Sequence, residues 1–376
     1  MGGAVATTST GFEAVYYNPA SLTLASDLSF NIGIQGAHFD LHLNQQKLDV
    51  RDAPALTIGF GLPIPFGGWL EKRLTLGFGF VIPQSSVLIA DIPRPGEPGF
   101  TLLETRAQAV AIQAALGVHI TDWLAFGFGM LALGELDGGV NVAPKDDGSL
   151  GSTVKSELVA TYSYTGGILL KPAGWFRAAF TLRSSSYARF VYPMEVSLGE
   201  DFPLPIPPLH IEGLAQYDPF QMSVECSFQL TSRWLLALGV VMKAWSAFPN
   251  VVEYTATQPD TAPQPEPNFN DTLVTRLGTE GRFEWGDTVL TPRAGLVYEP
   301  TPAPDATGFH SYLDNDRVIA SFGLGFEWSF LQIGVSGQWH HLLGRSVTKT
   351  AEGAEPAVLD HGGNMFFWLI ETGVRL

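Results

Sequence analysis

The chain alternates strictly between apolar residues and polar or small residues, from about residue 28 to its end. In residues 318–330 the even positions hold Val, Ala, Phe, Leu, Phe, Trp and Phe, whereas the odd positions hold mainly Ser, Gly and Glu. A repeat of two residues is that of a β-strand, whose successive side chains point to opposite faces. Helical periodicity is nearly absent, so we expect an all-β fold.

Residues 153–164 and 223–230 show the same alternation, with one apolar and one polar face. Strands with one apolar face occur in two architectures. In a soluble sandwich the apolar face is buried, whereas in an outer-membrane barrel it contacts lipid and the polar face lines the lumen. Of the 376 residues 15% are charged, against about 25% in a typical soluble domain. No stretch approaches the ~20 apolar residues of a membrane-spanning helix. Composition therefore allows a very apolar core or a barrel in a membrane.

The spacing of turn signals separates these two architectures. We expect fourteen strands, beginning near residues 28, 53, 72, 104, 122, 153, 174, 209, 233, 271, 287, 312, 331 and 361. Short turns such as ITDW, KPAGW, LTSRW and EWGD follow the even-numbered strands, and longer polar or Pro-rich links follow the odd-numbered ones. Short turns on one rim, long loops on the other and an even strand count predict an outer-membrane β-barrel.

Aromatic residues support this prediction. Five tryptophans lie in or beside the turns of one rim: Trp123, Trp175, Trp234, Trp285 and Trp328. They fit an aromatic girdle at a membrane boundary, although tryptophan also simply favours strand ends. The last strand, MFFWLIETGVRL, is amphipathic and stops at Leu376, where outer-membrane barrels usually have an aromatic residue.

Three stretches of the sequence resemble one known family. The opening block MGGAVATTSTGFEAVYYNPASL is similar to the N-terminal block of the FadL-type outer-membrane transporters (OMPP1/FadL/TodX), which carry long-chain fatty acids and other hydrophobic compounds. An element in a middle strand of the family resembles the stretch KAWSAFPNVV. A later strand of the family, its Pro-rich loop and the start of the next strand resemble TPRAGLVYEPTPAP followed by YLDNDRVIASFGLGFEW. The order of these stretches matches that of the family.

The resemblance implies a monomeric fourteen-stranded barrel at 28–376, with residues 1–27 folded inside the lumen as a plug. It also implies that ligand leaves sideways beside a kinked third strand. The sequence predicts that sheet pairing fails there and that a kink results, because Pro83 lacks a ladder donor and two glycines on one face lack side chains, although a bulge for curvature would give the same pattern. The plug and gate candidates are Tyr16, Tyr17, Asn18, Pro19, Ala20, Gly77, Gly79 and Pro83.

Ligand-binding candidates are of two kinds. A fatty-acid carboxylate inside an apolar lumen needs a cation, because an unpaired buried charge is costly; by position the candidates are Lys243, Arg183 and Arg293. These cations can instead pair with lumenal Glu157, Glu280, Glu284 or Glu299. Apolar residues on the Pro-rich loop EDFPLPIPPLHIEG suggest a ligand groove or packing over the barrel mouth: Phe202, Leu204 and Ile206.

We therefore expect passive uptake of hydrophobic small molecules, such as long-chain fatty acids, lipids or hydrocarbons, through an outer-membrane barrel surrounded by lipopolysaccharide. The alternatives are a scaffold or shuttle for secreted proteins and, less favoured, a membrane-embedded lipid hydrolase. We expect no catalytic or metal-binding residues and no cofactor. A net charge of −16 argues against nucleic acid as a partner. We further expect a truncated or processed N-terminus, because no export signal precedes the plug block.

Overall fold

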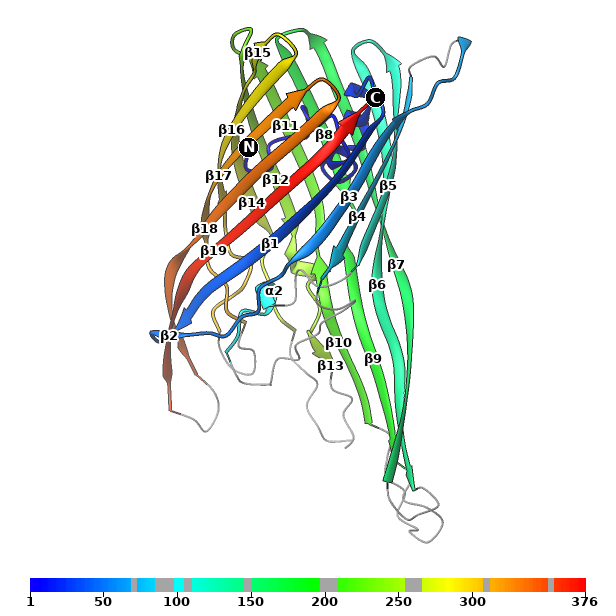
Figure 1. The fold of residues 1–376 in the computed structure, drawn as a ribbon. Helices are drawn as coiled ribbons and strands as arrows, with labels where there is room; N and C mark the ends of the chain where they lie inside the picture. Colours follow the sequence, from blue (N-terminus) through cyan, green and yellow to red (C-terminus); the bar gives the residue numbers. More distant parts are fainter. Residues whose placement is uncertain are drawn as a thin grey trace.

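The computed structural model describes residues 1–68, 73–84, 98–104, 110–144, 150–196, 209–253, 266–306, 312–350 and 355–376. These form one closed antiparallel barrel of fourteen strands (Figure 1). The barrel closes because β1 pairs with β3 on one edge and with β19 on the other, so that Ser29 lies opposite both Gly61 and Arg375. The predicted all-β class and strand number are confirmed.

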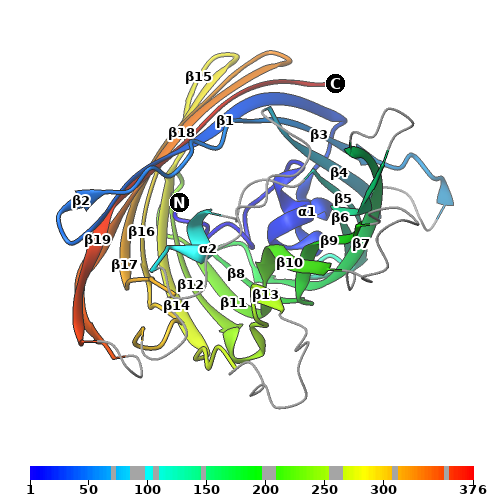
Figure 2. The ribbon, with the colours of Figure 1, turned by 90° about the horizontal axis from the view of Figure 1, so that it is seen from below.

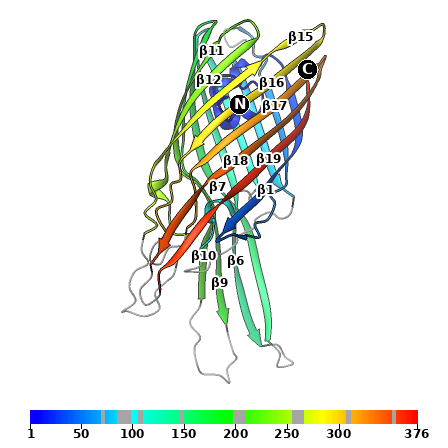
Figure 3. The ribbon, with the colours of Figure 1, turned by 90° about the vertical axis from the view of Figure 1, so that its left-hand side faces the viewer.

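The barrel strands follow one another around the ring in chain order. They are β1 (Ser29–Leu43), β3 (Ala55–Pro63), β4 (Leu74–Pro83), β5 (Ala111–Thr121), β6 (Leu124–Pro144), β7 (Leu150–Ala173), β8 (Phe176–Arg183), β11 (Phe220–Gln229), β12 (Trp234–Ala244), β14 (Thr272–Gly281), β16 (Thr288–Glu299), β17 (Arg317–Trp328), β18 (Leu331–Lys349) and β19 (Ala357–Arg375). Strands β6 and β7 extend well beyond their neighbours at one end (Figure 3).

Shorter elements complete the described chain. Strand β9 (Ser186–Val196) continues the course of β8, and β10 (Leu209–Asp218) leads into β11. The remaining short elements are β2 (Gln46–Lys47), β13 (Val252–Glu253), β15 (Phe283–Trp285), α1 (Glu13–Tyr17), α2 (Thr101–Glu104) and the 3-10 helices η1 (Pro19–Leu24) and η3 (Trp245–Ala247). Among the described helices, none has the length and apolar character needed to cross a membrane.

The burial pattern of the strands is inverted relative to that of a soluble sandwich. On β17 the apolar Phe322 and Leu324 are 69% and 48% exposed, whereas Arg317 and Ser321 are buried. Strand β11 repeats the pattern, because Val224 is half exposed while Glu225 and Ser227 are buried. The apolar side chains therefore form the outer surface, as a barrel in lipid requires.

The links between strands largely follow the predicted alternation. Short turns join β5 to β6, β7 to β8, β11 to β12, β15 to β16 and β17 to β18, and these lie at the top of Figure 1. The five tryptophans predicted for this rim are all more than 40% exposed. The expected tight turn after the second strand is wrong, because β3 and β4 are separated by residues 64–73.

Residues 1–27, here called the N-terminal segment, pack against strands β3 to β7, β12, β14 and β16 through small residues of those strands. A Cβ atom on Gly127 would lie 2.2 Å from the backbone of Pro19 and Ala20, and one on Gly295 would lie 2.3 Å from that of Met1. In Figure 2 the ribbon of the segment, in dark blue, is drawn within the outline of the strands. The strand glycines thus provide the space that the segment fills.

The third barrel strand, β4, is paired continuously on both edges. It pairs with β3 from Pro83 to Thr75 and with β5 from Leu74 to Val81, without a register shift. The predicted failure of pairing at Gly77 and Gly79 is therefore wrong. Pro83 is the last residue of β4, so its missing N–H interrupts no ladder.

The two glycines of β4 serve a different purpose. A Cβ on Gly77 would lie 2.6 Å from Val15 and 2.7 Å from Leu22, and one on Gly79 would contact Phe12. Their missing side chains thus make room for the N-terminal segment.

Candidate functional site

A cavity of about 450 Å³ lies between the N-terminal segment and the inner faces of six neighbouring strands, β14, β16 to β19 and β1. Its walls consist of glycines, such as Gly323, Gly325 and Gly334, and of charged side chains. The charged residues on its walls are Glu13, Asp27, Glu280, Arg282, Arg293, Glu327, Glu371 and Arg375. Because these strand positions lie near the β17–β18 turn and the end of β19, the cavity belongs to the short-turn half of the barrel.

Ion pairs hold several of the cations in this cavity. The Nε atom of Arg293 lies 2.6 Å from Glu280, and Arg375 lies 3.3 Å from Glu327. Arg282 pairs with Glu284 at 2.8 Å. The pairing of Arg293 with Glu280 is one that the sequence offered as the alternative to ligand binding, and all three arginines of the cavity wall already have carboxylate partners.

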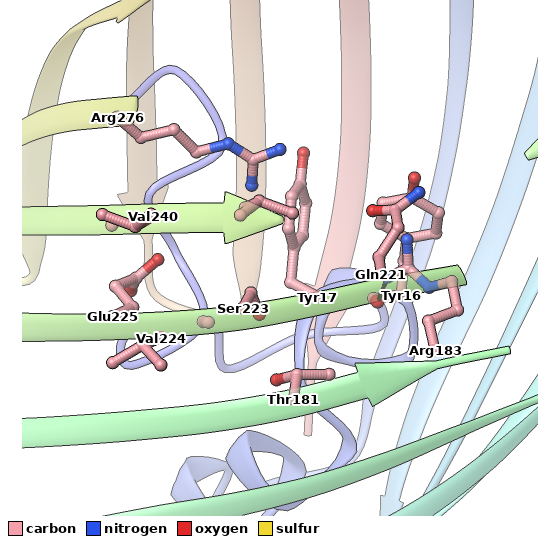
Figure 4. A pocket seen from close by; sticks show the side chains of 13 residues that line it. Tyr16, Tyr17, Thr181, Arg183, Gln221, Ser223, Val224, Glu225, Val240 and Arg276 are labelled. Atoms are coloured by element: carbon pink, nitrogen blue, oxygen red, sulfur yellow. Dashed lines mark hydrogen bonds between the residues drawn. The ribbon is translucent and has the colours of Figure 1, made fainter. Parts of the chain in front are cut away.

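A second cavity, of about 30 Å³, lies beneath the two tyrosines of the N-terminal segment (Figure 4). Arg183 donates a hydrogen bond to the carbonyl oxygen of Tyr16, and its guanidinium lies 3.8 Å from the centre of the Tyr16 ring. Arg276 donates to the carbonyl oxygen of Gly3 at 3.1 Å. Burial raises the pKa of the Tyr17 phenol. These arginines therefore bind the N-terminal segment to the barrel wall.

Asn18 is the polar centre of this attachment and is fully buried. Its amide nitrogen donates to the carbonyl oxygens of Ala6 at 3.1 Å and of Ile168, on β7, at 3.2 Å. Its amide oxygen accepts from the N–H of Ala20 at 3.1 Å and so caps η1. One side chain thus joins two parts of the segment to the barrel.

The three cations predicted to bind a carboxylate do not converge on one site. Arg183 lines the smaller cavity and Arg293 the larger one. Lys243 lies in neither and pairs with Glu299 at 2.5 Å, with both side chains largely buried. Their role in ligand binding stays a prediction, and a carboxylate would compete with the partner that each cation already has.

Two clusters of buried apolar side chains lie at the end of the barrel opposite the short turns. The aromatic cluster contains Leu102, Leu214, Tyr217, Trp245, Phe248, Val251, Phe269, Ala303 and Tyr312. The aliphatic cluster contains Ala37, Phe39, Leu41, Phe100, Leu103, Ala306, Leu313, Leu342, Leu359 and Met365. These two clusters make the interior apolar at this end of the barrel.

Part of these clusters was recognisable in the sequence. Trp245 and Phe248 belong to the motif KAWSAFPNVV, whereas Phe100, Leu102 and Leu103 lie in a link with no periodic pattern. The predicted loop residues Phe202, Leu204 and Ile206 lie outside the described residues.

Comparisons with known proteins agree with the fold. A family described as outer membrane protein transport protein (OMPP1/FadL/TodX) matches residues 1–359. A FadL homologue of Pseudomonas aeruginosa has a similar structure, with a TM-score of 0.68 and 14% identity over 99% of this chain and 95% of that one.

Two toluene transporters are also similar in structure. TodX of Pseudomonas putida has a TM-score of 0.60 and 13% identity over 98% of this chain and 95% of its own. TbuX of Ralstonia pickettii has a TM-score of 0.56 and 13% identity, over 96% and 93%. No curated protein sequence matches the chain.

Proposed function

The chain belongs to the OMPP1/FadL/TodX family of outer membrane transport proteins, and on that premise we propose that it takes up hydrophobic small molecules by passive diffusion through the barrel. The observation that carries this proposal is the pair of apolar clusters inside the barrel. The inner face of an outer-membrane barrel is ordinarily polar, so apolar side chains gathered there fit a ligand path. Burial of the ligand's apolar surface, worth about 25 cal/mol per Å², would draw the ligand into the barrel without an external energy source.

In this proposal the N-terminal segment is a plug in the lumen. Its support is the fit between the segment and the strand glycines, together with the hydrogen bonds of Asn18, Arg183 and Arg276. The plug separates the apolar clusters from the cavity of about 450 Å³ in the short-turn half. A ligand that passes the plug would reach that cavity.

The proposed exit therefore runs along the lumen toward the short turns. Continuous pairing of β4 with both neighbours gives no support for a sideways exit at Gly77 or Gly79. The cavity of about 450 Å³ beside the N-terminal segment supports the route along the axis.

Uptake measurements test the function. The chain would be expressed in a Gram-negative host that lacks a transporter of this family, and uptake of radiolabelled toluene, octane and palmitate would be compared with that of vector-only cells. We expect faster uptake of at least one hydrocarbon. Rates equal to the vector control for all three compounds, with folded barrel in the outer membrane, would contradict the proposal.

A further inference from the structure

The cavity of about 450 Å³ has more acidic than basic side chains on its walls. Five carboxylates and three arginines line it, and each of these arginines pairs with a glutamate. Three of the carboxylates have no ion-pair partner within the described part of the chain: Glu13, Asp27 and Glu371. The cavity therefore carries an excess of negative charge that no basic side chain on its walls balances.

Glu371 lines the cavity from β19, at a position where both neighbouring strands have glycine. It lies opposite Gly33 on β1 and Gly334 on β18. A Cβ atom on Gly334 would lie 2.7 Å from the carboxylate oxygen Oε1 of Glu371. The nearby Arg293 acts on the charge of Glu371 but donates its own hydrogen bond to Glu280 at 2.6 Å. The glycines thus leave room for the Glu371 carboxylate without supplying a partner for it.

Glu13 lines the same cavity from the N-terminal segment. Its carboxylate accepts hydrogen bonds from the backbone N–H groups of Thr10 at 3.2 Å and Gly11 at 3.0 Å, which fix its position at the start of α1. Glu13 lies close enough to Glu371 for the two charges to interact. Two carboxylates from distant parts of the chain therefore act on one cavity.

The wall also contains a neutral polar group without a partner. Ser29, at the start of β1, lines the cavity and is 6% exposed, and among the described residues its hydroxyl finds no hydrogen-bond partner. A buried hydroxyl without a partner is costly. Rotation about χ1 would turn this hydroxyl toward an occupant of the cavity, so the wall favours a ligand with an uncharged polar group.

These features determine how the charge of a ligand affects its passage. Inside a protein, water screens charges less than in bulk, so the carboxylates of the wall repel an anion strongly. An anion would bind one of the arginines only by displacing a glutamate, whose charge would then lack a partner. An uncharged molecule meets neither cost.

We propose that this cavity selects ligands by charge: Glu13 and Glu371 exclude anions, and the barrel passes uncharged hydrophobic molecules, alcohols included. This proposal rests on the proposed function and its route along the lumen. It adds the class of substrate and the residues that determine it.

Two probes of equal chain length test the proposal, since palmitate is an anion and hexadecanol is uncharged. Initial uptake of each, above that of vector-only cells, would be measured in a host that lacks a transporter of this family. Glu13→Gln/Glu371→Gln removes two charges from the cavity at nearly constant side-chain size. The matched control Asp122→Asn/Asp287→Asn removes two charges from short turns outside the cavity.

We expect the unmodified protein to take up hexadecanol faster than palmitate. The Glu13→Gln/Glu371→Gln variant should raise the ratio of palmitate to hexadecanol uptake by about tenfold, because it removes the repulsion of the anion alone. The control variant should leave the ratio unchanged. Metabolism of the probes is the same in all these cells, so it cancels when the variants are compared.

The outcomes separate the two proposals. An unchanged ratio in the folded cavity variant, with hexadecanol uptake above the vector level, overturns the charge selection and leaves the proposed function standing. An equal rise of the ratio in the control variant also overturns it, because charges outside the cavity would then have the same effect. Uptake of toluene, hexadecanol and palmitate at the vector level by the unmodified protein contradicts the proposed function itself.

A second variant tests the same charge balance at another position. Glu280→Gln leaves Arg293 without its partner and makes the cavity less negative. The heat-dependent mobility of the barrel on gels reports whether each variant has folded. We expect palmitate uptake to rise relative to hexadecanol uptake, and an unchanged or lower ratio in the folded variant overturns the proposal.

Discussion

At the scale of single residues, the inner glycines show how one sequence pattern has two physical meanings. A glycine within a strand marks either a weak point of the sheet or a close approach by another part of the chain. On β4 the second meaning holds, because Val15 and Leu22 fill the space at Gly77. The sequence alone could not distinguish these, because the identity of the approaching segment depends on the closed barrel.

Adjacent glycines on β7 provide a matched test of this packing. A Cβ on Gly167 would lie 2.0 Å from the Asn18 side chain, whereas one on Gly166 would meet nothing within 4 Å. Valine suits a strand, so Gly167→Val should displace the N-terminal segment at a cost of about 1–3 kcal/mol while leaving the barrel folded. Gly166→Val should have little effect. Chymotrypsin cleavage after Tyr16 or Tyr17, followed by mass spectrometry, measures the displacement, and equal cleavage of both variants would refute it.

Removing the Asn18 side chain should loosen the same segment, because its hydrogen bonds are lost. Asn18→Ala deletes the bonds to Ala6, Ile168 and Ala20 and leaves buried backbone groups without those partners. We expect a loss of about 1–3 kcal/mol in the stability of the segment and faster amide exchange over residues 20–24. Asn18→Asp keeps the acceptor and loses the donors, so its exchange should be intermediate. Exchange as slow as in the unmodified protein would show that the segment is held by other contacts.

At the scale of elements, alternation and turn signals predict most strands to within a few residues. Three barrel strands start at other positions than expected. The eighth, expected near 209, is β11 and begins at Phe220, because Leu209–Asp218 form the separate strand β10. The other two starts were displaced for local reasons. The strand expected near 104 begins at Ala111, because Thr101–Glu104 form α2. The strand expected near 312 begins at Arg317, because in the link before it Tyr312 bridges to Gly99 and buried Asp314 pairs with Arg317. Elements of one turn carry too few residues to show a period.

The pairing of β4 with β5 leads to a prediction about the exit. Val81 lies opposite Ala111 at the end of this pairing, so Val81→Cys/Ala111→Cys places a disulfide across the edge where a sideways exit would open. If the ligand leaves along the lumen, oxidation should leave toluene uptake unchanged to within about twofold, because the closed state already has this geometry. A large, reductant-reversible loss of uptake would show that these strands separate during transport.

At the scale of the whole molecule, the barrel is apolar outside and charged inside, and alternation alone predicts this arrangement. Alternation does not predict which charges meet, because the partners depend on the register of the strands and can come from strands that are not adjacent. Lys243 on β12 reaches Glu299 on β16 across β14, and only the register of three strands brings them together. The candidate cations were therefore identifiable from sequence, whereas their partners and the position of α2 between the two apolar clusters were not.

The outward apolar face leads to a prediction that depends on depth in the membrane. Phe322, in the middle of β17, is 69% exposed, and Trp328, at the short-turn end of the same strand, is 57% exposed. In lipid, Phe322→Arg should destabilise the folded barrel by about 2–4 kcal/mol, whereas Trp328→Arg near the boundary should cost about 0–1 kcal/mol. In water the two substitutions would have similar costs, since neither side chain is buried by protein. Urea titration of both variants in lipid vesicles, followed by tryptophan fluorescence, measures the difference, and equal costs would place the apolar face outside the bilayer.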